Sequence, residues 1–210
     1  MAPCAGLFAL LLVLAADARA LDLPASYGYR IHHQIFGDIG EHRMTVRLED
    51  GAVVVEHTAE LAVVILGLTA FHRRTRFREV WEGDRLVAFD GLVVDNGERF
   101  LVRARAERGS LMIEGSAGRI RAPPGTAPSE PSLERAIRRD RFFDSKTGEL
   151  LGAQVTAAGR EPLEVGPGII EATRYEVSGE LDQHVWFDAS GAWVQWRLWR
   201  QGAAITLTRD

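Results

Sequence analysis

The chain has 210 residues, 46% of them hydrophobic, which suits one globular domain with a sizeable core. A net charge of −4 excludes the basic surface expected of a nucleic-acid-binding protein and gives no polybasic membrane signal. Cys4 is the only cysteine, so an internal disulfide is excluded.

The N-terminus predicts an export signal. Residues 5–16 form an unbroken apolar run that is too short to span a bilayer core as a helix. The small-x-small sequence Ala18-Arg19-Ala20 follows it, as signal peptidase requires. We expect residues 1–20 to be a signal peptide and residues 21–210 to be one domain in the periplasm or outside the cell. The mature chain would then contain no cysteine and no transmembrane segment. A buried N-terminal helix is the alternative interpretation.

Short polar turns divide the rest of the chain at the spacing of β-hairpins. Asp50-Gly51, Asn96-Gly97 and Arg108-Gly109 are examples, and Asp-Gly and Asn-Gly tolerate the positive φ that tight hairpins need. Segments with a two-residue hydrophobic period lie between the turns. The expected strands are Tyr27 to Phe36, Glu41 to Glu49, Ala52 to Leu66, Thr75 to Trp81, Arg85 to Val94, Arg99 to Glu107, Leu111 to Glu114, Gly152 to Ala157, Ile169 to Ser178, Leu181 to Asp188, Trp193 to Trp199 and Ala203 to Thr208.

This pattern predicts an all-β fold, a curved antiparallel meander that forms a half-open or closed β-barrel. An insertion at about residues 122–140 interrupts it. Residues 122–131 hold four of the eight prolines and indicate a loop, and Ser132 to Arg139 indicates one short helix with Ser132 as its N-cap. Such an insertion is often the lid or plug of a barrel, although a plain connector is the commoner case.

The faces of the first strands follow from a turn at Gly37-Asp38, which places His33 opposite His42 and Ile31 opposite Met44. One face then collects the apolar residues and the other the arginines. Strand three adds residues 53, 55, 57, 59, 61 and 63 to the apolar face, so that His57 is diagonal to His42. In the last strands, Trp193 and Trp196 are expected on opposite faces, so something apolar must cover each side.

Three histidines, His33, His42 and His57, share the apolar face in this register and are the only candidate metal ligands. No carboxylate on that face obviously completes the set, and lining the polar end of a cavity is the simpler interpretation. Glu79 and Glu82 flank Trp81, and carboxylates beside a hairpin turn are usually solvated. Nucleophile and phosphate-loop motifs are missing, so we expect neither an enzyme nor a cofactor.

Several motifs resemble an uncharacterised family of exported proteobacterial proteins, known only as a domain of unknown function. They are Tyr29-Arg30-Ile31 with Gly37-Asp38-Ile39-Gly40-Glu41-His42, then Glu79-Val80-Trp81-Glu82-Gly83-Asp84-Arg85-Leu86, Asp144 through Gly148, Gly179-Glu180-Leu181 and Val185-Trp186-Phe187-Asp188-Ala189-Ser190-Gly191. The looser pattern is similar to periplasmic half-barrel proteins that carry lipids or lipoproteins, in which a curved sheet wraps a hydrophobic cavity. This resemblance implies a fold rather than an active site.

The leading hypothesis is therefore a non-enzymatic periplasmic protein that holds a hydrophobic or lipid-like ligand in the concavity of its sheet. A structural or protein-interaction module with a filled core is the alternative, and a metal-dependent enzyme that uses the histidine cluster is the third hypothesis. Oligomeric state is left open. The residues expected to line the ligand site are Tyr29, Ile31, Met44, Val55, Leu61, Val63, Trp81 and Phe100.

Overall fold

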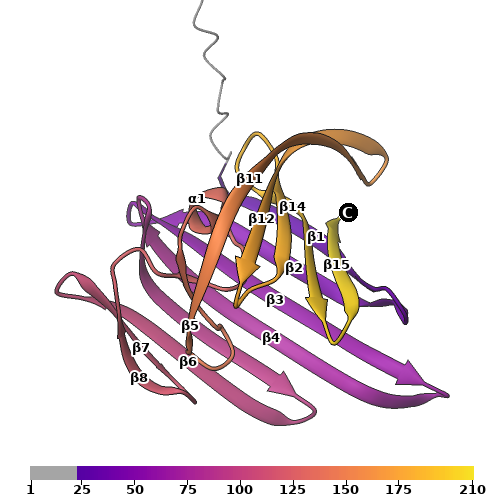
Figure 1. Cartoon of the computed structure of the whole chain (residues 1–210), viewed down its shortest axis with the longest axis horizontal. Helices are drawn as coiled ribbons and strands as arrows, with labels where there is room; N and C mark the ends of the chain where they lie inside the picture. The colour runs from indigo at the N-terminus through magenta and orange to yellow at the C-terminus, as the bar shows by residue number, and fades with distance from the viewer. Residues whose placement is uncertain (1–22) are drawn as a thin grey trace, which may run out of the picture.

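The computed structural model describes residues 23–210, so the expected signal peptide lies outside the described residues. One continuous 15-stranded sheet makes up most of the described chain, in the order β8-β7-β6-β5-β4-β3-β2-β1-β15-β14-β13-β12-β11-β10-β9 (Figure 1). The strands are β1 Ala25–His33, β2 Gly37–Glu49, β3 Ala52–Ile65, β4 Leu68–Glu82, β5 Arg85–Asp95, β6 Glu98–Glu107, β7 Ser110–Gly115, β8 Gly118–Ala122, β9 Ala127–Pro128, β10 Arg141–Phe143, β11 Leu150–Val165, β12 Gly168–Gly179, β13 Gln183–Phe187, β14 Trp193–Arg200 and β15 Ala203–Arg209.

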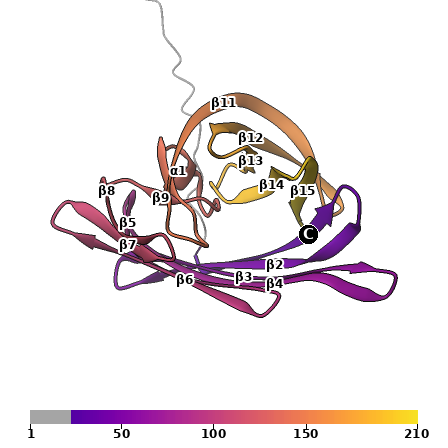
Figure 2. The same cartoon turned by 60° about the horizontal axis from the view of Figure 1, so that its bottom comes forward.

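The pairing of β1 with β15 joins two meanders, so the two edges of the sheet are β8 and β9, which follow each other in the chain. The sheet bends over on itself without closing. In Figure 2, β2 to β4 and β6 lie below and β11 to β15 above. The predicted all-β fold, a curved antiparallel sheet in a half-open form, is confirmed. No helix within residues 23–210 is long and apolar enough to cross a bilayer.

The insertion fills the concave side of the sheet. It contains β9, helix α1 (Glu134–Ile137) and β10, and α1 lies above the lower strands, beside β11, in Figure 2. Leu133, Ile137, Phe142 and Phe143 are almost fully buried in the main core, where Phe143 packs edge-on against Phe89. The single short helix is confirmed, but its predicted N-cap is wrong: Leu133 precedes the helix in an extended conformation, with no side-chain cap.

Hairpin turns set the register of the sheet. Asp50-Gly51, Asn96-Gly97 and Arg108-Gly109 have positive φ at both central residues, as the sequence predicts. The first turn is different, because β1 ends at His33 and β2 begins at Gly37, so Tyr29 rather than His33 lies opposite His42. The predicted register of this hairpin is therefore wrong by four residues, and because four is even the apolar face is preserved.

A second, smaller core covers the opposite face of the sheet. The curled β11–β12 hairpin packs Leu163, Val165, Ile170 and Ala172 against Trp186 and Val194. Trp193 and Trp196 both pack against the main core, because the pairing of β13 with β14 shifts register between Trp186 and Phe187. This bulge reverses the predicted face of Trp193, since one extra residue inverts the alternation.

Candidate functional site

The predicted ligand-lining residues lie in or beside the main core. Six have at most 9% of their surface exposed, and Leu61 and Phe100 are partly buried against them. Tyr29 stacks on Trp193 with ring centroids 4.0 Å apart, and its hydroxyl donates to the Trp193 carbonyl. These side chains fill the interior together with the insertion. Their role as ligand contacts stays a prediction.

The three candidate metal ligands do not come together. His42 and His57 are diagonal neighbours, as predicted, and their Nε2 and Nδ1 atoms are 3.1 Å apart. His33 instead pairs with Gly37 at the far end of β1 and contacts Phe36. Within residues 23–210 no group of three or more His, Cys, Asp or Glu side chains could hold a metal ion.

The two buried histidines belong to a polar chain that runs into the core. His57 Nε2 lies 3.4 Å from Glu79 Oε1, and Trp81 Nε1 donates to Glu79 Oε2 over 2.7 Å. Glu79 is fully buried, although Glu82 is exposed as expected. The prediction of a solvated Glu79 is wrong because it shares the inward face of β4 with Phe77 and Trp81.

Burial governs the electrostatics of this chain. Desolvation, with the neighbouring His57 as a smaller cause, holds the pKa of His42 well below 6.5. His42 borders a small surface hollow of about 370 Å³ with Tyr29, Tyr27 and Asp210. A neutral imidazole has one nitrogen that donates and one that accepts a hydrogen bond. The rings of Tyr29 and Trp193 pack edge-on against that of His42.

The largest hollow among those found lies where the insertion meets β11 and β12. We call it the seam groove. It measures about 1020 Å³. Its lining residues are Pro123, Pro124, Gly125, Thr126, Arg138, Arg139, Asp140, Arg141, Ala153, Gln154, Val155, Thr156, Ala157 and Tyr175.

The floor of the seam groove is apolar and lies on the concave side of the sheet. Ala153 and Tyr175 belong to the main core, and Val155 packs against it. The pairing of Val155 with Val177 and of Ala157 with Tyr175 places these residues on one surface. The groove is thus the part of the concavity that the insertion leaves unfilled.

Arginines form the rim of the seam groove. Arg138 is paired with Glu134 and donates to the Tyr175 hydroxyl, whereas Arg139 and Arg141 form no ion pair with a carboxylate of residues 23–210. Burial, reinforced by its hydrogen bond to Glu134, raises the pKa of Tyr175. Asp140 is the one acidic lining residue, so the groove carries an excess of positive charge.

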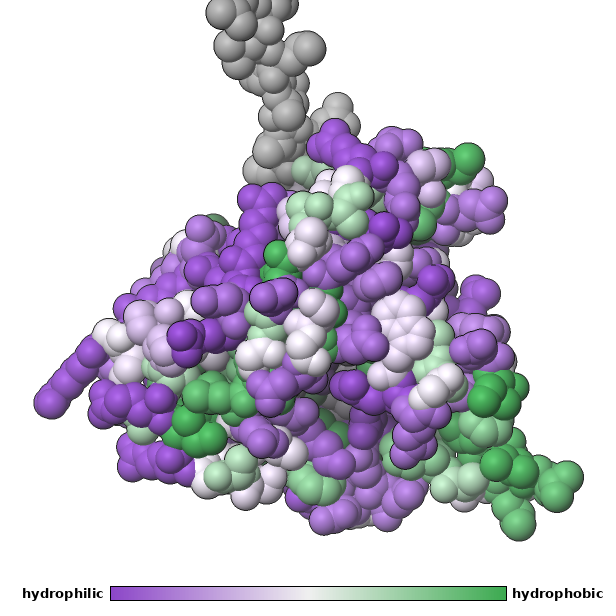
Figure 3. Space-filling view, viewed as in Figure 1, coloured by the Kyte–Doolittle hydropathy of each residue, from purple (hydrophilic) through white to green (hydrophobic). Residues whose placement is uncertain are grey.

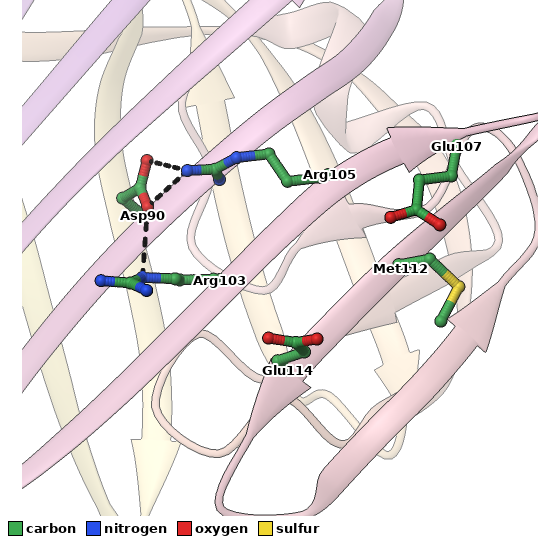
Figure 4. Close-up of a pocket in the computed structure, with 6 residues that line it drawn as sticks. All are labelled: Asp90, Arg103, Arg105, Glu107, Met112 and Glu114. Atoms are coloured by element: carbon green, nitrogen blue, oxygen red, sulfur yellow. Dashed lines mark hydrogen bonds and ion pairs between the residues drawn. The ribbon is translucent and has the colours of Figure 1, made fainter.

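A second hollow, of about 300 Å³, lies on the outer surface of β5 to β7 (Figure 4). Asp90 there makes two hydrogen bonds with Arg105 and a longer ion pair with Arg103. Glu114 pairs with Arg119 outside the hollow, and the exposed Glu107 carboxylate forms no ion pair within residues 23–210. This is the usual pattern of charges on the solvated face of a sheet.

Comparison with protein families assigns the chain to one family. Residues 36–210 match the family described as "Domain of unknown function (DUF6134)". The chain belongs to this family. No curated protein matches it. The predicted membership of a family of unknown function is confirmed.

A solved structure shares the fold of this DUF6134 protein. The crystal structure of a β-barrel-like protein of domain of unknown function DUF1849 from Brucella abortus superimposes with a TM-score of 0.63 over 89% of this chain and 95% of that one. The two sequences are 8% identical, so the likeness concerns the fold alone. It supports the β-barrel-like architecture described above.

Sequence reasoning missed the seam groove. Its residues come from the proline-rich loop, the end of α1, β10, β11 and β12, which are far apart in the chain. The sequence does contain one signal of the groove, the arginine-rich run at residues 138–141, which begins within the last two residues of the predicted helix. The burial of Glu79 could have been predicted from Trp81, because residues two apart in a strand point to the same face.

Proposed function

We propose that this DUF6134 protein is an exported, non-enzymatic binding protein whose ligand is an anionic amphiphile, a molecule with an apolar chain and a negatively charged head. The seam groove carries the proposal, because Arg139 and Arg141, which form no ion pair within residues 23–210, border an apolar floor; Arg139 also donates a hydrogen bond to the Asp84 carbonyl. Ligand sites are typically concave and mostly apolar, with a few charged groups that orient the ligand. The site therefore lies in the concavity, as the sequence suggests, but uses other residues than those expected.

Size and charge support this ligand class. The volume of about 1020 Å³ is at the upper end of the range for small-molecule sites, so a long acyl chain fits. Guanidinium groups bind carboxylates and phosphates through two parallel hydrogen bonds. The packed interior beneath the insertion, in contrast, leaves the eight predicted lining residues in contact with one another.

A binding assay with oleate tests the proposal, and oleyl alcohol serves as the probe that has the same chain without the charge. Isothermal titration should show binding of oleate and much weaker binding of the alcohol. The double variant Arg139→Gln/Arg141→Gln should weaken oleate binding about tenfold, the loss expected when charge-assisted hydrogen bonds are removed. Arg103→Gln, in the hollow of Figure 4, is the matched control and should bind like the wild type.

Three results would contradict the proposal. Oleate could fail to bind, it could bind equally to the double variant and the control, or the alcohol could bind as tightly as oleate. Mass spectrometry of an organic extract of the purified protein then identifies the natural ligand, which we expect to carry an acidic head group.

Export is the second part of the proposal and rests on the apolar run at residues 5–16 and on Ala18-Arg19-Ala20. Mass measurement of the protein from a periplasmic fraction should give a chain that begins at Leu21. A cytoplasmic protein that retains residues 1–20 would overturn the assigned location and leave the seam groove unaffected.

A further inference from the structure

The β3–β4 hairpin ends in exposed apolar side chains. Val64, Ile65, Leu66 and Leu68 expose 57%, 47%, 98% and 75% of their surface. We call residues 64–68 the apolar tip. All of residues 61–71 are uncharged, so neither face of this hairpin end is polar. Figure 3 shows hydrophobic surface projecting at the lower right, where β3 and β4 end in Figure 1.

The apolar tip projects beyond the strands on either side. Pairing of β2 with β3 begins at Gly40 and Leu61, and pairing of β4 with β5 ends at Arg73 and Asp95. The hairpin continues for several residues past these pairs without a neighbouring strand. Both of its edges are therefore open, and its two faces are open as well, because the consecutive residues Val64 and Ile65 are 57% and 47% exposed. Such exposure is uncommon for a contiguous apolar segment.

The turn inside the apolar tip differs from the other two-residue turns in its first residue, which is a leucine. Five two-residue turns of the sheet have positive φ at a residue followed by glycine, and the first residue is Asp50, Leu66, Asn96, Arg108 or Gln201. Four of these five residues are polar. Positive φ disfavours a residue such as leucine, and Asn or Asp is the preferred choice. Leu66 is 98% exposed, so its side chain contributes almost nothing to the core of the described chain.

A turn at the same end of the sheet also exposes apolar side chains. Ile35 and Phe36, in the β1–β2 turn, expose 71% and 44% of their surface. The β14–β15 turn lies beside them, since Gln34 and Ala204 exchange hydrogen bonds. Neither turn contains an acidic residue, and Arg200 forms no ion pair within residues 23–210.

We propose that the apolar tip inserts into the surface of a lipid bilayer and attaches the protein to a membrane. A projecting hairpin that is apolar on both faces needs an apolar medium on all sides, and the outer part of a lipid layer provides it. Asp38, near the start of β2, is paired with His32, whereas Arg200 forms no ion pair within residues 23–210 and can contact anionic head groups. A second copy of the chain would cover one face and leave the other exposed.

Cosedimentation with vesicles tests this attachment. The probes are vesicles of phosphatidylcholine and vesicles of phosphatidylethanolamine with phosphatidylglycerol. Wild-type protein should bind, more tightly to the anionic vesicles. Leu66→Ser/Leu68→Ser should reduce partitioning by about tenfold for each leucine removed. Leu48→Ser/Ile169→Ser, which removes two exposed apolar residues elsewhere, should bind like the wild type.

All three proteins carry the same N-terminal residues, so the apolar run at residues 5–16 contributes equally to each. Absence of wild-type binding to both kinds of vesicle overturns the proposal, as does equal loss in the tip variant and its control. Light scattering adds another contradictory outcome: a wild-type dimer that the tip variant dissociates would assign the tip to self-association. Oleate binding by the tip variant should be unchanged, so this test is independent of the seam groove.

Discussion

The polar chain beneath Trp81 and the apolar tip both reverse the usual distribution of side chains. In the core, His42, His57 and Glu79 are buried among apolar residues; at the apolar tip, Leu66 and Leu68 face solvent. The difference lies in what surrounds them. Each buried polar group has at least one polar neighbour in the chain Trp81–Glu79–His57–His42. The leucines of the tip have no apolar partner that covers them.

The polar chain finds its neighbours inside the protein, whereas the apolar tip has no covering partner within residues 23–210. A buried polar network whose members lie against one another contributes to the uniqueness of a core. In this chain Trp81 donates to Glu79 and His42 lies within hydrogen-bond distance of His57, whereas His57 Nε2 and Glu79 Oε1, 3.4 Å apart, form no hydrogen bond. An exposed apolar segment is unfavourable in water, and its burial against an apolar partner lowers the free energy. We therefore assign the polar chain to the fold and the apolar tip to an external contact, and four predictions test this division.

The largest effect is expected from Glu79→Ala. The substitution leaves the Trp81 indole N–H and the His57 imidazole without their buried partner, which should lower the free energy of unfolding by about 3–5 kcal/mol. Urea denaturation followed by tryptophan fluorescence measures this change. Glu82→Ala, three residues away and exposed, should change it by less than about 0.5 kcal/mol. Equal effects would mean that the polar chain is not part of the fold's stability.

Acidification should weaken the fold through His42. Its pKa is lower in the folded protein than the ordinary 6.5, so below that pH the unfolded chain binds the proton first. The free energy of unfolding should fall by up to about 1.4 kcal/mol per pH unit as the pH decreases from about 6.5 toward the folded-state pKa. His42→Gln should flatten this slope between about pH 7 and pH 5. Burial raises the pKa of Glu130, so that carboxyl group acts with the opposite sign, and its contribution is the same in the variant and the wild type. An unchanged slope in the variant would show that His42 is not the group responsible.

Leu66→Asn should stabilise the protein by about 0.5–1 kcal/mol, because asparagine tolerates the positive φ of this turn better than leucine. Asp50→Leu places leucine in the equivalent position of the β2–β3 turn and should destabilise it by a similar amount. Thermal unfolding of both variants checks the pair. A destabilised Leu66→Asn protein would show that the leucine contributes to the fold itself and would undermine its assignment to an external contact.

The smallest effect on stability is expected in the seam groove. Arg139→Gln/Arg141→Gln should change the free energy of unfolding by about 0.5 kcal/mol, because neither side chain forms an ion pair within residues 23–210 and the hydrogen bond that is lost, from Arg139 to the Asp84 carbonyl, is exposed. Denaturant unfolding beside the oleate titration measures it. A large loss of stability would make these arginines structural and would remove the observation on which the proposed ligand rests.

The sequence by itself determined the all-β class, most of the hairpins and the buried face of the first strands. Local chemistry is sufficient for these features: Asp50-Gly51 and Asn96-Gly97 encode their turns, and a two-residue hydrophobic period encodes which side of β2 and β3 faces inward. The apolar face was predicted correctly although the first hairpin was misregistered, because an even shift preserves side-chain parity. Leu66-Gly67 was not recognised as a turn, since its first residue lacks the usual polar chemistry.

Only the tertiary structure decided what fills the concavity and what remains open. Strands β8, β9 and β10 were missed because they are short; β8 pairs with β7 in a hairpin, and β9 and β10 gain their pairing from the packed insertion. Glu79 is buried because it lies on the inward face of β4, between Phe77 and Trp81, with His57 on the neighbouring strand. The seam groove requires Arg139, Arg141, Val155 and Tyr175 to meet from four segments, and contacts between segments far apart in the chain leave no trace in local periodicity. The fold class follows from short-range patterns, whereas the candidate site follows from long-range packing.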